Sequence, residues 1–169
     1  MQAINQKIEP LNTKINKKGN LEISGCDVVG LAKKYSTPLY VIDEVTLSLM
    51  MADYKRAFAK YKKVNMMYAS KALMTSSIAK IISNHGFGFD VVSKGEIVTL
   101  LNAQIDLSKV SFNGNNKTKE EILFALENNI GRFSVDNFYD LELLNSLAKE
   151  ENIIQKIHLR VTPGIECHT

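Results

Sequence analysis

The stretch Val64-Asn65-Met66-Met67-Tyr68-Ala69-Ser70-Lys71-Ala72 decides how the fold of this chain is interpreted. A short, mostly apolar run that leads directly into a helical pattern is typical of a buried strand, here with Lys71 at its carboxyl end. Because side chains alternate along a strand, Ala69 and Lys71 share one face, and the small alanine leaves space beside the lysine. A half-desolvated lysine at this edge of an α/β protein loses its proton readily and attacks carbonyl groups. The alternative is a lysine that ends a strand and points to solvent, and a lone lysine favours that alternative.

Beyond this stretch, apolar runs and amphipathic segments alternate regularly. Five expected strands, at about 64–71, 87–93, 110–113, 132–136 and 156–162, carry polar residues at or near their carboxyl ends. These strand-end residues, which follow one another at intervals of 19, 23, 23 and 24, are Lys71, Asp90, Asn113, Asp136 and Arg160. Expected helices cover about 74–84, 94–103, 118–130 and 137–151, most of them with a capping residue at the start. Strict alternation of strands and helices predicts a parallel sheet with right-handed crossovers.

The polar side chains of these strands repeat on one face only. Small or polar residues share that face with the strand-end residues, whereas large apolar residues point the other way. A doubly wound sheet is apolar on both faces, but a barrel has helices only outside and can carry a polar site inside its upper layer. The pattern therefore favours an α/β fold, an incomplete (β/α)8 TIM barrel of about five βα units, over a Rossmann-like sheet. A closed barrel needs eight strands and about 250 residues, so we expect these 169 residues to be the N-terminal piece of a longer protein.

The N-terminal part of the chain does not follow this alternation. We expect residues 1–38 to form an N-terminal arm with a short strand and helix, and residues 39–169 to form the first part of the barrel. The elements expected near the N-terminus are a tail over 1–18, a strand over 20–23, a helix from a cap within Ser24–Asp27 to Lys34, a strand over 39–42 and a helix from the cap Asp43 to about Lys62.

Composition is that of a soluble globular protein, with 45% hydrophobic and 23% charged residues. No apolar run can span a membrane, and the N-terminus has polar residues where a signal peptide needs an apolar block, so we expect a cytoplasmic protein without a membrane partner. The net charge of +3 is spread along the sequence, and no nucleic-acid partner is expected. Cys26 and Cys167 form no disulfide framework and are expected to be ordinary buried thiols. The three histidines lack ligand spacing, so no metal is expected.

The strand-end residues suit one kind of chemistry. A lysine beside inward carboxylates and an arginine, above a barrel, fits Schiff-base chemistry with a carbonyl cofactor. The structural alternative is an ion pair between Asp90 and Arg160, and spacing alone does not decide between the two. Gly86-Phe87-Gly88 is a weak dinucleotide-binding candidate because it precedes a strand, whereas such a loop follows one.

Four separated blocks carry a resemblance to a known family. Tyr68-Ala69-Ser70-Lys71-Ala72 resembles the pyridoxal-phosphate lysine motif of the fold-type III decarboxylases, which share the alanine racemase barrel. Residues 89–96 resemble the next strand and helix start of that family. Residues 112–117 are similar to the Gly-Asn-Asn-Lys loop of the diaminopimelate decarboxylase branch, and residues 159–164 with 167–169 to its arginine strand.

This resemblance implies a function and a cofactor. It implies a homodimeric lyase of lysine biosynthesis that decarboxylates meso-2,6-diaminopimelate, a small amino-acid substrate, to L-lysine and CO2, while this piece alone is inactive. It implies that Lys71 is catalytic and binds pyridoxal 5'-phosphate covalently, with Ala69, Asp90 and Arg160 around the cofactor. It also implies that the strand near Leu21 joins a C-terminal β-domain absent from these residues. An ornithine or arginine decarboxylase of the same fold, and a non-catalytic pyridoxal-phosphate-binding barrel protein, stay open as alternatives.

Overall fold

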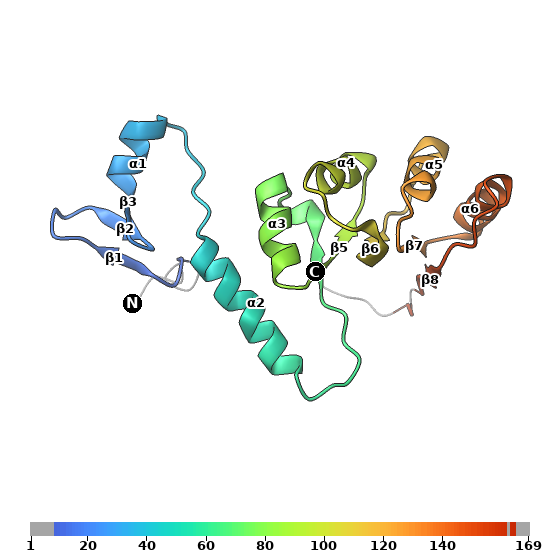
Figure 1. Cartoon of the computed structure of the whole chain (residues 1–169), viewed down its shortest axis with the longest axis horizontal. Coiled ribbons are helices and arrows are strands. Elements are labelled where there is room, and N and C mark those ends of the chain that lie inside the picture. Colours follow the sequence, from blue (N-terminus) through green and yellow to red (C-terminus); the bar gives the residue numbers. More distant parts are fainter. Residues whose placement is uncertain (1–8, 162, 165–169) are drawn as a thin grey trace. The chain divides into compact units, whose positions relative to one another are not determined.

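The computed structural model describes residues 9–161, 163 and 164, and the chain packs as two compact units, Met1–Lys62 and Lys63–Thr169 (Figure 1). The boundary expected between an N-terminal arm (1–38) and the barrel (39–169) is a different one, because it concerns where the barrel begins in the whole protein. That boundary stays a prediction. Within the described ranges, every helix is too short or too polar to cross a membrane.

The first unit combines a small antiparallel sheet with two helices. Its strands pair in the order β1-β2-β3, and the elements are β1 (Thr13–Ile15), β2 (Leu21–Ile23), β3 (Cys26–Asp27), α1 (Val28–Tyr35) and α2 (Glu44–Phe58). Both helices begin at an aspartate whose carboxylate accepts hydrogen bonds from the first helical N–H groups, Asp27 for α1 and Asp43 for α2. An aspartate at this position satisfies N–H groups that have no partner inside the helix.

Several expectations for the first unit are wrong. Residues 13–15 form a strand rather than part of a tail, because β2 offers them a register partner. The helix cap is Asp27 alone, since Ser24 (φ 45°) and the glycine after it form the turn between β2 and β3. Residues 39–42 form no strand, because no strand of the described residues pairs with them. Helix α2 ends at Phe58 instead of residue 62. Cys26 is exposed rather than buried, and Cys167 lies outside the described residues.

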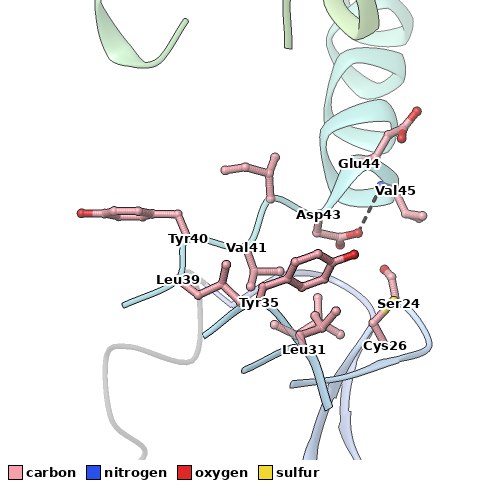
Figure 2. A pocket seen from close by; sticks show the side chains of 12 residues that line it. Ser24, Cys26, Leu31, Tyr35, Leu39, Tyr40, Val41, Asp43, Glu44 and Val45 are labelled. Atoms are coloured by element: carbon pink, nitrogen blue, oxygen red, sulfur yellow. Dashed lines mark hydrogen bonds between the residues drawn. The ribbon is translucent and has the colours of Figure 1, made fainter. Parts of the chain in front are cut away.

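A hollow of about 500 Å³ lies in the first unit and is lined mainly by apolar side chains (Figure 2). Leu31 and Tyr35 of α1 contribute to it, together with Leu39 and Val41 of the segment that leads into α2. Two carboxylates, Asp43 and Glu44, also line it, and that of Asp43 is engaged with the N–H groups at the start of α2.

The second unit alternates strands and helices as expected. The elements are β4 (Met67–Ala69), α3 (Ser76–Asn84), β5 (Gly88–Val91), α4 (Lys94–Asn102), β6 (Val110–Phe112), α5 (Lys119–Glu127), β7 (Arg132–Val135), α6 (Phe138–Glu150) and β8 (Ile157–Leu159), with 3-10 turns η2 (Ser70–Ala72) and η3 (Leu107–Lys109). The strands are parallel and lie in the order β4-β5-β6-β7-β8, and helices α3 to α6 cover one side of the sheet (Figure 1). Sequential parallel strands with helices on one side form part of a barrel, not a doubly wound sheet. The predicted fold class is thus confirmed, although the last strand is shorter than expected and Thr162 lies outside the described residues.

The core of the second unit lies between the sheet and these helices. Alternate strand residues are buried there, and in register Phe89 faces Val110 while Phe112 faces Phe133. The Phe112 and Phe133 rings pack with centroids 5.6 Å apart. On the other face of the sheet lie Ala69, Asp90 and Ser111, which are register partners across three neighbouring strands. The one-sided polarity predicted from the sequence therefore belongs to the face away from the helices.

Gly131 lies just before β7, where the backbone passes close to the turn that precedes β6. A Cβ atom at this position would lie 2.1 Å from the Ser108 carbonyl oxygen. We expect Gly131→Ala to lower the free energy of unfolding by about 2–3 kcal/mol, because the backbone must shift to relieve this overlap. The measurement is urea denaturation against Gly95→Ala in α4, where the nearest atom is 3.8 Å from a Cβ. Gly95→Ala is expected to be neutral or stabilising by up to about 1 kcal/mol, and equal losses in the two variants would contradict this account.

Helix α5 begins with a capping box that includes the Glu121 carboxylate. This carboxylate makes the free energy of unfolding depend on pH. The Glu121 carboxylate accepts hydrogen bonds from the backbone N–H groups of Thr118 (3.1 Å) and Lys94 (3.3 Å). Partial burial raises the pKa of Glu121, but these hydrogen bonds outweigh burial and hold the pKa below its ordinary value of 4.5. The ionised form therefore stabilises the fold fully above the unfolded-state pKa, and this stabilisation is lost as the pH falls through the folded-state pKa.

We expect Glu121→Gln to make the free energy of unfolding less dependent on pH below about 5, because this carboxylate no longer titrates. Urea denaturation between pH 7 and pH 3 measures the difference. An unchanged slope in the variant would show that the capping box does not carry the effect.

Candidate active site at the carboxyl ends of the strands

A hollow of about 550 Å³ opens at the carboxyl ends of the parallel strands. Among its lining residues are Lys71, Asp90, Asn113, Gly114, Ser134 and Arg160. These residues are far apart in sequence and meet because parallel strands end at one edge of the sheet. Three of the four predicted site residues line this hollow. The fourth, Ala69, faces Asp90 in the register of β4 and β5 and so lies on the same face of the sheet.

Lys71 lies in η2, the 3-10 turn that directly follows β4, and its side chain is exposed. Two expectations are therefore wrong in detail. The strand ends at Ala69 rather than at the lysine, and the lysine is not half desolvated. The reason for the exposure is that the helices of the second unit cover the opposite face of the sheet (Figure 1). Ser70, beside it, is turned inward with 2% exposure.

Asp90 is held at the hollow by the neighbouring strand. The side-chain amide of Asn113, which follows β6, donates to both carboxylate oxygens of Asp90 at 3.3 and 3.4 Å. The Asn113 side-chain oxygen accepts a hydrogen bond from the Gly114 N–H at 3.0 Å. Gly114 has φ +122°, a backbone conformation that side-chain-bearing residues rarely adopt. The asparagine therefore fixes the carboxylate and the start of the following loop together.

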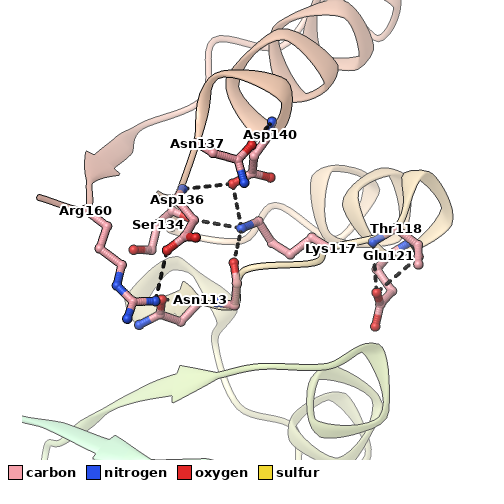
Figure 3. Close-up of polar contacts among 10 residues, drawn as sticks. Asn113, Lys117, Thr118, Glu121, Ser134, Asp136, Asn137, Asp140 and Arg160 are labelled. Carbon is pink, nitrogen blue, oxygen red and sulfur yellow. Dashed lines mark hydrogen bonds and ion pairs between the residues drawn. The ribbon is translucent and has the colours of Figure 1, made fainter. Parts of the chain in front are cut away.

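Arg160 contacts a different carboxylate from the one considered in the sequence analysis. Its Nη1 donates a hydrogen bond to Asp136 Oδ1 at 2.9 Å (Figure 3). The structural alternative of an Asp90–Arg160 ion pair is therefore wrong, and the two side chains face the same hollow with separate partners. The Arg160 side chain is 56% exposed, so its ion pair contributes only about 0–1 kcal/mol to stability. Its effect is to orient the guanidinium.

Neither of these two hydrogen-bond partners was expected from the sequence. A signal for them was present in the intervals between the strand-end residues. Asn113 lies 23 residues after Asp90 and Arg160 lies 24 after Asp136, and each pair belongs to neighbouring strands that end at the same edge. The intervals therefore limit the candidate partners to residues on neighbouring strands, and the choice between the two neighbours depends on the fold.

The site combines an exposed amine, an oriented carboxylate and an oriented guanidinium around one hollow. An amine condenses with carbonyl groups. A carboxylate accepts hydrogen bonds from a protonated nitrogen, and a guanidinium binds carboxylate or phosphate groups. The described part of the chain contains no cluster of three or more side chains that could hold a metal ion.

The chain is similar to known proteins over most of its length. Residues 47–169 match the family model described as pyridoxal-dependent decarboxylase, pyridoxal binding domain. Diaminopimelate decarboxylase of Bacillus methanolicus is 45% identical over 158 residues, which are 93% of this chain and 37% of the relative. The counterpart from Synechocystis sp. is 42% identical over 175 residues, covering 98% of this chain and 37% of the relative.

A solved structure of diaminopimelate decarboxylase from M. jannaschii superposes with a TM-score of 0.87 at 34% identity, covering 93% of this chain and 37% of the other. The chain thus spans a little over a third of the length of the relatives it matches.

Proposed function

Because the chain belongs to the family of the pyridoxal-dependent decarboxylases, we propose that the complete protein converts meso-2,6-diaminopimelate to L-lysine and CO2 with pyridoxal 5'-phosphate as cofactor. The observation that carries this proposal is the convergence of Lys71, Asp90 and Arg160 on one hollow. The 40–45% identity to several diaminopimelate decarboxylases supports this substrate over ornithine or arginine.

The donor set of the hollow fits pyridoxal phosphate. This cofactor carries an aldehyde, a ring nitrogen and an anionic phosphate, and the hollow offers an amine, a carboxylate and a guanidinium. We assign covalent attachment to Lys71. Asp90 and Arg160 hydrogen-bond to the ring region or to its supporting residues, and the small side chain of Ala69 leaves room. When bound, the cofactor supplies the electron sink that allows a carboxylate to leave as CO2.

The residues of this chain have separate tasks in that reaction. Lys71 must present a neutral amine, and its position on an exposed turn makes its Nζ accessible to the cofactor aldehyde. Asp90 keeps its orientation because the Asn113 amide holds both of its oxygens. Arg160 keeps its orientation through Asp136. Groups fixed before the reaction need no reorganisation during it.

The remaining proposals concern the whole protein. We infer a small amino-acid substrate, as the relative from Helicobacter pylori was solved in complex with L-lysine. The family resemblance supports a homodimer, in which residues 1–38 contribute a strand to a C-terminal β-domain and residues 39–169 begin the barrel. The proposed location is the cytoplasm, the compartment in which amino acids are made from small polar precursors.

The test is CO2 release by the complete protein, loaded with pyridoxal phosphate, from meso-diaminopimelate, ornithine and arginine in parallel. The proposal predicts release from meso-diaminopimelate, with ornithine and arginine at background. Release from ornithine or arginine but not from diaminopimelate would assign another decarboxylase of this fold. Cofactor binding without release from any of the three would assign a non-catalytic barrel protein.

A further inference from the structure

We propose that Lys117, which does not line the hollow, is a positioning residue for the decarboxylation site. Its ammonium group holds the backbone of two lining residues, Gly114 and Ser134, and through Asp140 it also supports the segment that orients Arg160. This inference rests on the proposed function, because the site it positions is the one assigned above.

The first observation is the burial of a charged pair. The Lys117 side chain is 2% exposed and that of Asp140 is 7% exposed. Lysine is almost never buried to this degree unless it is paired. Lys117 Nζ donates to Asp140 Oδ2 at 2.8 Å, to the Gly114 carbonyl at 2.7 Å and to the Ser134 carbonyl at 2.9 Å (Figure 3). An ammonium has three N–H donors, so each is used by one of these acceptors.

The second observation is where the three acceptors lie. Gly114 belongs to the loop after β6, Ser134 to β7 and Asp140 to the first turn of α6. A single buried nitrogen therefore connects two neighbouring βα units at the edge of the sheet that carries the hollow. Two of the three acceptors are backbone atoms of lining residues.

The third observation links the pair to Arg160. Asp140 Oδ2 also accepts a hydrogen bond from the Asp136 N–H at 3.1 Å. The Asp136 side chain in turn accepts the hydrogen bond from Arg160 Nη1 at 2.9 Å. Direct contacts thus run from Lys117 through Asp140 and Asp136 to the guanidinium at the hollow (Figure 3).

If the Lys117–Asp140 pair only stabilised the fold, Lys117 would not need to donate to the backbone of two residues that line the hollow. Replacing both members of a buried ion pair by apolar residues is often neutral or even stabilising, whereas removing one member is costly. The two effects are therefore separable by experiment. The double variant Lys117→Met/Asp140→Leu removes both charges, so no buried charge is left unpaired. It also removes the three hydrogen bonds of Lys117 and the one that Asp140 accepts from the Asp136 N–H.

The experiment compares the complete wild-type protein with this double variant and with Lys94→Met as a matched control. Lys94 also forms an ion pair, with Glu120, but both side chains are substantially exposed and neither lines the hollow. The first readout, taken without cofactor, is amide hydrogen exchange over residues 113–116 and 134–137. The second is kcat and KM for CO2 release from meso-diaminopimelate.

We expect the double variant to melt near the wild-type temperature but to exchange amides over residues 113–116 about tenfold faster, with exchange in α3 and α4 unchanged. We also expect kcat/KM to fall about 10- to 100-fold, because a displacement of about 1 Å in a reacting site can cost a factor of this size. Lys94→Met is expected to match the wild type in both readouts.

A double variant that folds with wild-type exchange and wild-type kcat/KM would overturn the inference. If the double variant does not fold, Asp140→Asn decides, since its amide oxygen keeps one acceptor. Faster exchange over residues 134–137 in that variant supports the inference, and unchanged exchange overturns it. Absence of CO2 release from the wild type would instead remove the proposed function, and the exchange readout would still test the link between Lys117 and the loop.

Discussion

Replacing Lys71 by alanine in the complete protein is expected to abolish CO2 release from meso-diaminopimelate, with kcat lower by roughly a thousandfold or more. Among the described residues that line the hollow, Lys71 alone carries an amine. Without it, the cofactor aldehyde has no covalent partner at the site, and the orienting groups Asp90 and Arg160 cannot replace this chemistry. The measurement is the initial rate of CO2 release at saturating pyridoxal phosphate.

The matched control is Lys80→Ala. Lys80 lies in α3 of the same unit, is exposed and does not line the hollow. Its substitution removes one positive charge of the same kind and is expected to leave the rate within about twofold, since surface substitutions away from special features have small effects. A Lys71→Ala protein that retained a tenth of the wild-type rate would contradict the role assigned to this lysine.

The single substitution Lys117→Met is expected to lower the free energy of unfolding by about 3–5 kcal/mol, because it leaves the Asp140 carboxylate buried and unpaired. The Gly114 and Ser134 carbonyls lose a donor at the same time. Urea denaturation followed by circular dichroism measures the loss.

Lys94→Met provides the comparison for this prediction. The Lys94 side chain is 37% exposed and that of its partner Glu120 is 80% exposed, so the loss is expected to stay within about 1 kcal/mol. Similar losses in the two variants would mean that burial of the Lys117–Asp140 pair does not set its energetic effect.

The features that could be predicted from the sequence have local signals. Helix starts in the second unit follow from Ser93, Thr118 and Asn137, each of which accepts a hydrogen bond from the third helical N–H group as a cap does. The buried strands follow from short apolar runs with alternate polar residues. Because these signals repeat along the second unit, the order of its elements and its fold class were predictable.

The features that could not be predicted depend on partners far away in the chain. Strand β1 exists because β2 pairs with it, and residues 39–42 have a strand-like sequence but no described partner. Lys117 precedes a capping box, a position where a lysine is ordinarily solvated. Only the fold brings Asp140, 23 residues later, within 2.8 Å of its ammonium. Distant pairing of this kind leaves no periodic pattern in the sequence.

In the candidate site, too, some features could be predicted from local signals and others depend on distant partners. Lys71, Asp90 and Arg160 could be placed at one edge because strand ends recur at regular intervals. Their hydrogen-bond partners could not be placed, because the choice between Asp90 and Asp136 as the partner of Arg160 depends on the register of neighbouring strands. The exposure of Lys71 depends on which face of the sheet the helices cover.

The whole proposed function depends on the amine of Lys71 taking up pyridoxal phosphate. Its most direct test is to incubate the complete protein with this cofactor, reduce the covalent linkage with borohydride and map the modified peptide by mass spectrometry. We expect near-stoichiometric modification of Lys71, with the other lysines, Lys117 included, modified only in trace amounts. Modification spread over surface lysines with Lys71 unmodified would contradict it.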